Sequence, residues 1–232
     1  MTDGAAIMTL NLTPEQIEAL FSRPGGGYAF ARWGRPIAPI VFGVEEETLK
    51  TVKGALEAVV TLAGHQMAET DPELGANLMF FFFREWDELL EVPDLGRLIP
   101  DLDPLVARLK AADASQYRAF RFDDQGGIQA CFTFLRMSGD MAKLPAETLA
   151  LTQAVQAMLT WGDSAFAETS PLAVLPDTGA TILRPEIAGV IAAAYDRMMP
   201  VSAADSSHAL RLFARLQAPV TPPADDAAPT TH

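Results

Sequence analysis

The stretch that decides the fold is residues 77–83, Asn-Leu-Met-Phe-Phe-Phe-Phe, in which an unbroken apolar run follows one asparagine. Such a run is apolar on both faces when it is extended, which is typical of a strand that is covered on both sides in the middle of a sheet. The charged residues that follow it, Arg84, Glu85, Asp87 and Glu88, are typical of gatekeepers that oppose aggregation. The sequence therefore predicts a central β-strand here.

Three other segments supply candidate strands around this one. Residues 37–42 resemble a strand in which Pro39 favours an edge position or a bulge. Residues 116–123 and 128–137 flank the turn Asp-Gln-Gly-Gly, which predicts a β-hairpin. Alternation in its first strand should place Tyr117, Ala119 and Arg121 on one face and Arg118, Phe120 and Phe122 on the other.

Helices are predicted before, between and after these strands. Thr13, Pro14 and Gln16 form a capping box that starts a helix before the glycines at 25–27. Residues 45–63 carry apolar residues at helical spacing, and Asp103 should cap a short helix that runs to about residue 112. After Pro145 we expect only helices, over residues 147–159, 185–199 and 202–216. The fold class is then α+β, with a mixed sheet of about four to five strands covered by helices and a helical C-terminal part.

Composition indicates a folded globular protein, because 49% of the 232 residues are hydrophobic and 20% are charged. One cysteine excludes an internal disulfide. The tail 218–232, APVTPPADDAAPTTH, cannot bury a core and is predicted to be disordered. We expect a flexible N-terminus over residues 1–11 and a single domain over residues 12–217.

The charge balance limits the kinds of partner. The net charge is −13 and the basic residues are scattered, which disfavours nucleic acid and anionic membranes. No apolar stretch approaches the 20 or so residues that cross a membrane. The first ten residues contain no Lys or Arg, so no secretory signal is visible, and a cytoplasmic location is expected.

Residues for metal or covalent chemistry are scarce. The three histidines, His65, His208 and His232, form no H-E-x-x-H pair, and no phosphate-loop or nucleophile-elbow motif occurs. Cys131 lies between Ala130 and Phe132, which favours a buried apolar filler over a nucleophile. We therefore predict no metal, no cofactor and no catalytic residue, and the sequence favours a protein that is not an enzyme.

The helix at 147–159 carries one polar group of interest. Thr152 and Gln156 lie four residues apart and share a face, with Gln153 beside them. This is the spacing of an H-E-x-x-H zinc helix with every functional group replaced, and amide or hydroxyl groups are poor zinc ligands. The alternative is an ordinary amphipathic helix whose inward residues are Leu151, Val155, Met158 and Leu159.

Four blocks in the chain point to a family: FARWGRP at 30–36, AN at 76–77, QAVQAML at 153–159 and AYDRMMP at 194–200. In order and spacing they resemble an uncharacterised bacterial domain of unknown function with a zincin-like, metallopeptidase-type architecture, over about residues 28–215. The resemblance implies a degenerate metallopeptidase scaffold without established activity. Thr152, Gln153 and Gln156 would stand at the degenerate zinc-helix positions.

Two main hypotheses on function follow. The first is a non-catalytic scaffold whose sheet edge or helix-lined cleft holds a peptide or protein partner, with residues 37–42 as a place for strand addition if they form an edge. The alternative is a peptidase-like hydrolase with an unrecognised carboxylate site, for which Asp87, Glu88, Asp163 and Glu168 are the candidates. A small-molecule binder that uses Met and Phe side chains is a third hypothesis.

Overall fold

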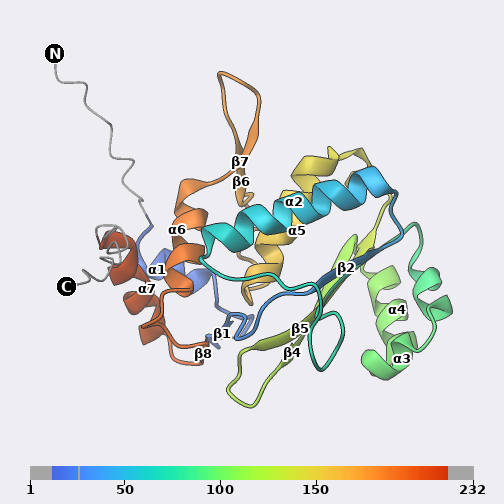
Figure 1. Cartoon of the computed structure of the whole chain (residues 1–232), viewed down its shortest axis with the longest axis horizontal. Coiled ribbons are helices and arrows are strands. Elements are labelled where there is room, and N and C mark those ends of the chain that lie inside the picture. The colour runs from blue at the N-terminus through green and yellow to red at the C-terminus, as the bar shows by residue number, and fades with distance from the viewer. Residues whose placement is uncertain (1–11, 26, 219–232) are drawn as a thin grey trace, which may run out of the picture.

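The computed structural model describes residues 12–25 and 27–218. The predicted flexible N-terminus 1–11 and residues 219–232 of the predicted tail lie outside this range. A four-stranded sheet with the order β2-β3-β5-β4 stands at the centre of the described chain (Figure 1). Its strands are β2 (Pro39–Phe42), β3 (Leu78–Phe83), β4 (Gln116–Phe122) and β5 (Ile128–Arg136).

The sheet is mixed, as the sequence predicts. β3 runs parallel to β2 on one side and to β5 on the other, and β4 pairs antiparallel with β5 as the predicted hairpin. The Phe-rich run is therefore an inner strand, and residues 37–42 contain an edge strand. The α+β class with a mixed sheet covered by helices is confirmed.

Helices cover both faces of the sheet. On one face, α2 (Glu46–Leu62) packs against α5 (Ala146–Met158), which follows the short η2 turn (Met141–Lys143). On the other lie η1 (Trp86–Glu91), α3 (Leu95–Leu98) and α4 (Leu102–Ala111) (Figure 1). Phe80 and Phe82 enter the core under α2 and α5, while Phe81 and Phe83 enter the core under α4. Two separate apolar layers explain why β3 has no polar face.

The C-terminal part is less helical than the sequence suggests. α6 (Pro185–Ala194) and α7 (Ser207–Gln217) pack together beside α1 (Pro14–Ala19). However, β6 (Leu172–Val174) and β7 (Thr181–Leu183) form a hairpin, and β8 (Ser202–Ala203) pairs antiparallel with β1 (Phe30–Ala31). The expectation of helices only after Pro145, with one starting at residue 202, is therefore wrong. Pairing with a strand about 170 positions earlier in the chain overrides the local helical pattern.

One predicted helix cap is confirmed and another is wrong. The Thr13 hydroxyl accepts the amide of Gln16, and the Gln16 side chain accepts the amide of Thr13, as a capping box requires. By contrast, α4 is preceded by Asp101, and Asp103 lies inside its first turn. The earlier start brings Leu102 into the core layer under α4. The Asp103 carboxylate remains favourable there, because the first turn carries the positive end of the helix dipole.

Gly43 is the first residue after β2, and its backbone conformation sets the direction in which the chain leaves the strand. Its φ is +82°, and a Cβ at this position would lie 2.0 Å from the backbone oxygen of Phe82. Gly43→Ala is therefore expected to lower the free energy of unfolding by about 2 kcal/mol. Gly54→Ala is the matched control: Gly54 lies inside α2 with open space around its Cα, so alanine should raise stability by about 0.5–1 kcal/mol. Urea unfolding of both variants checks the prediction, and a stable Gly43→Ala protein contradicts it.

Candidate functional site

The outer edge of β4 presents unpaired backbone groups. Arg136 donates its amide to the carbonyl of Ser115, so alternation along the antiparallel ladder directs the amides of Tyr117 and Ala119 toward β5. The N–H and C=O groups of Gln116, Arg118 and Phe120 therefore point away from the sheet. Within residues 12–25 and 27–218, no other element bonds to them. This edge is seven residues long and contains no proline.

Two cavities, of 490 and 400 Å³, lie on the α5 side of β4 and share Arg23 in their walls, and together we call them the β4 groove. The wall on the β4 side consists of Gln116, Tyr117, Arg118, Phe120 and Phe122. The opposite wall comes from the end of α5 and the segment after it: Gln156, Leu159, Thr160, Trp161, Gly162, Asp163, Phe166 and Ala167. The smaller cavity is also lined by Gly126 of the hairpin turn and by residues 29–31 and 202–204, around β1 and β8.

A third cavity flanks the same strand on its other face. It has a volume of 440 Å³ and lies between β4 and α4. Tyr117, Ala119 and Arg121 line it from the strand, as the predicted alternation requires, and Asp101 and Arg108 line it from the helix side. The edge of β4 therefore lies between concave surfaces on both faces of the sheet.

Arg118 joins the β4 groove to α5. Its Nε donates to the hydroxyl of Thr133 (3.2 Å), Nη1 donates to Oε1 of Gln156 (2.9 Å), and Nη2 donates to Oε1 of Gln153. Gln153 is 2% exposed, and its amide nitrogen donates to the side chain of Gln116 (3.0 Å). Two of the three polar residues that the sequence marks on this helix, Gln153 and Gln156, thus meet around an arginine. Thr152 does not join them, because its hydroxyl donates to the carbonyl of Thr148 (2.8 Å).

The charge of Arg118 is not compensated by a carboxylate. No Asp or Glu oxygen within the described residues comes within 4.0 Å of its guanidinium, and its partners are all neutral. Burial lowers the pKa of Arg118, because desolvation disfavours the charged form. Arg23, the other groove cation, pairs with Asp163 (3.3 Å). The groove lining therefore carries one net positive charge in a chain whose net charge is −13.

The wall opposite β4 packs against the segment that follows α1. Gly162 donates its amide to the carbonyl of Leu20 (2.7 Å), and a Cβ on Gly162 would lie 2.4 Å from the backbone oxygen of Ser22. The indole of Trp161 donates to the carbonyl of Val155 (3.0 Å) and stacks on Phe21. The close approach of the segment after α1, together with the bonds between Thr160 and Ala31, therefore holds this wall in place.

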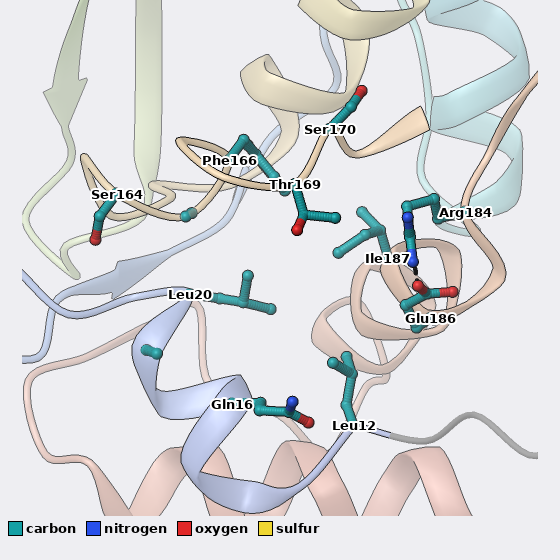
Figure 2. A pocket seen from close by; sticks show the side chains of 12 residues that line it. Leu12, Gln16, Leu20, Ser164, Phe166, Thr169, Ser170, Arg184, Glu186 and Ile187 are labelled. Carbon is teal, nitrogen blue, oxygen red and sulfur yellow. Dashed lines mark hydrogen bonds and ion pairs between the residues drawn. The ribbon is translucent and has the colours of Figure 1, made fainter. Parts of the chain in front are cut away.

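Another cavity, of 620 Å³, lies behind that wall (Figure 2). Figure 2 shows three apolar side chains directed into it: Leu20 at the end of α1, Phe166 in the segment after α5, and Ile187 of α6. Among the residues that the structure describes, the charged groups that line it are Arg184 and Glu186, which pair with each other at 2.6 Å. Phe166 also lines the β4 groove, so residues 164–167 separate the two hollows. The cavity itself offers no unpaired charge to a ligand.

The histidines and the cysteine that the sequence singles out lie away from the groove lining. His65 Nε2 lies 2.9 Å from the carbonyl oxygen of Arg35, and burial lowers its pKa. His208 Nδ1 lies 2.8 Å from the Tyr28 hydroxyl, under the ring of Phe30. Cys131 is fully buried in β5, and desolvation raises the pKa of its thiol to about 11. The prediction of a buried filler is confirmed for Cys131. His232 lies outside the described residues.

The acids proposed for a hydrolase lie in two places: Asp87 and Glu88 are on η1, whereas Asp163 and Glu168 are in the segment that follows α5. Asp87 pairs with Lys110 of α4 (2.6 Å), and Glu88 accepts the amides of Arg84 and Glu85 at the start of η1. Asp163 lies in the β4 groove beside Arg23. Within the described part of the chain, no three His, Cys, Asp or Glu side chains converge as metal ligands would.

The sequence analysis did not single out Arg118 for the candidate site. Strand alternation places Arg118 on the same face of β4 as Phe120, and helical spacing singles out Thr152 and Gln156, with Gln153 beside them. The missing step was to connect the two, because nothing in the linear sequence shows that residue 118 and residues 153–156 are neighbours. One sequence signal could have indicated this residue: an arginine on the same face of the strand as Phe120, because a charged side chain is rarely buried without a partner.

Comparison of the chain with family models, with curated proteins and with solved structures finds no match. The resemblance to a zincin-like family stays a prediction. The structure contributes one finding on membranes: among the helices of residues 12–25 and 27–218, none has both the length and the apolar character to cross a bilayer.

Proposed function

We propose that this protein binds an extended segment of a partner protein along the free edge of β4 and does not act on it chemically. The bound segment adds a strand to the sheet, and its side chains alternate between the β4 groove and the cavity beside α4. The observation that carries the proposal is the combination of a proline-free edge with concave surfaces on both faces.

β4 is a better site than β2, the edge that the sequence suggested. β2 has only four residues and begins with Pro39, which has no N–H to donate. Its Ile40 and Phe42 are 37% and 43% exposed on the face that α4 covers elsewhere. β4 offers the outward-pointing N–H and C=O groups of three residues. Its pairing with β5 shifts register only at its C-terminal end, between Arg121 and Phe122.

A second copy of this chain is a poorer occupant of the edge than a segment of another protein. Each copy carries a net charge of −13, so two copies repel each other at long range. Size-exclusion chromatography with light scattering separates the cases, and a dimer that is lost on substitution of Phe120 by proline would contradict the proposal.

Peptides selected from a random 12-residue library on the purified full chain supply the probe for a direct test. Phe120→Pro removes one outward N–H without touching the bonds to β5, and Phe120→Ala removes the same side chain but keeps the N–H. We expect the proline variant to bind the selected peptides about tenfold more weakly than the alanine variant, because a carbonyl of the peptide loses its partner. Fluorescence anisotropy measures both affinities, and equal affinities contradict strand addition at β4.

Hydrogen exchange provides a second readout on the unmodified protein. The amides of Gln116, Arg118 and Phe120 should exchange fast in the free protein and slow down when a selected peptide binds. The amides of Tyr117 and Ala119 bond to β5 and should change little. If a selected peptide slows exchange only for amides of β2, or only for amides of residues that line the cavity of Figure 2, the peptide binds there and not at β4.

A further inference from the structure

Arg118 is held in a conformation that leaves part of its guanidinium free. A guanidinium has five N–H groups, and three hydrogen bonds join Arg118 to Thr133, Gln153 and Gln156. Within residues 12–25 and 27–218, its two remaining N–H groups have no partner, and the side chain lines the β4 groove. The two glutamines and the threonine fix the plane of the guanidinium but bring no negative charge.

We infer that Arg118 receives the carboxylate of an Asp or Glu side chain of the segment bound along β4. The inference rests on the proposed function and adds to it the chemical class of the residue that is recognised. A carboxylate completes the hydrogen bonding of the guanidinium and compensates a charge that burial otherwise leaves unpaired.

The charges of the groove favour a carboxylate over a doubly charged group. Arg23 is paired with Asp163, so among the described lining residues Arg118 alone contributes an uncompensated positive charge. One carboxylate balances that charge. Phosphate groups are usually held by clusters of arginines, and this lining contains no such cluster.

The position of Arg118 on β4 also predicts which residue types flank the acidic residue in the bound segment. Side chains of an added strand face those of β4 on the same side of the sheet, with a spacing of two residues. On the groove side, Gln116 precedes Arg118, and Phe120 and Phe122 follow it. The bound segment should therefore carry an apolar side chain two positions from the acid on one side and tolerate a polar one on the other.

The test compares peptide selections on the full chain and on two variants. Arg118→Met removes the groove arginine, and Arg97→Met makes the same change at an exposed arginine of α3 that lines neither the β4 groove nor the cavity beside α4. We expect Asp or Glu to be enriched at one position by the unmodified protein and by Arg97→Met, and not by Arg118→Met. Replacing that acid by its amide in a synthetic peptide should weaken binding about tenfold to the unmodified protein and less than twofold to Arg118→Met.

Arg118→Met also removes the donor for two glutamines, so its fold is checked by circular dichroism and urea unfolding. Arg118→Lys keeps the charge without the planar fork; it should keep the acid preference and bind the acidic peptide more weakly. Selected peptides with an amidated C-terminus should bind as tightly as those with a free one. If only the free form binds, a terminal carboxylate is the ligand and the assignment to a side chain is overturned.

Failure of this inference is distinguishable from failure of the proposed function. Peptides that protect the outward amides of β4 but show no preference for acids overturn the inference alone. An acid preference that persists in Arg118→Met also overturns it. If no peptide is selected, or if the selected peptides protect other segments, both the inference and the proposed function are wrong.

Discussion

Phe80→Ala is expected to lower the free energy of unfolding by about 4 kcal/mol. The Phe80 side chain is fully buried in the inner strand β3, between Val41 of β2 and Thr133 of β5, and it packs in the core under α2 and α5. Truncation removes a buried ring and leaves a cavity that a strand bonded on both sides cannot close. Urea unfolding, with the slope m compared between variants, measures the loss.

Phe122→Ala is the matched control for this loss. Phe122 is the same residue type at the end of the edge strand β4 and is 50% exposed, so its truncation should change stability by less than about 1 kcal/mol. If Phe80→Ala does not fold, Phe80→Leu keeps most of the volume and should lose less than about 1.5 kcal/mol. Similar losses for Phe80→Ala and Phe122→Ala would contradict the assignment of β3 as the central strand.

Stability is expected to fall by about 3 kcal/mol between pH 7 and pH 4 through His208 alone. This residue is 3% exposed in α7, and its Nε2 has no partner within the described residues. Burial, with a smaller contribution from the charge of Arg211, lowers its pKa from 6.5 to about 4. Adding a proton would place a charge beneath the ring of Phe30, without a carboxylate partner among the described residues.

The sign follows from which state binds the proton. Between pH 4 and pH 6.5 the unfolded chain protonates this histidine and the folded chain does not, so the contribution is complete above pH 6.5 and is lost as the pH falls. About 2 kcal/mol should already be lost at pH 5, where most carboxylates are still ionised. His208→Leu and His208→Asn remove the titration, and both should flatten the pH dependence over this range. An unchanged slope in both variants would show that His208 is already charged in the folded protein.

The candidate site shows where sequence reasoning succeeds and where it stops. The alternation in residues 116–122 placed Arg118 and Phe120 on one face, and the helical spacing selected Thr152, Gln153 and Gln156 as polar groups of interest. Neither pattern could show that Arg118 meets the two glutamines and not Thr152, because contact between residues 35 or more positions apart depends on how α5 lies over the sheet. The same limitation explains β8, whose strand conformation depends on β1.

By itself, the sequence determined the α+β class, the central Phe-rich strand, the β4–β5 hairpin and three of the helices that cover the sheet, α2, α4 and α5. These features follow from local periodicity and turn chemistry, which act over a few residues. Three properties were decided by the tertiary structure alone. The outer edge of β4 is free, the segment at Gly162 packs closely against the chain after α1, and Arg118 lies in the β4 groove with no carboxylate partner among the described residues. Those properties depend on which distant segments pack together, and the free energy of that packing is a property of the whole core rather than of any one segment.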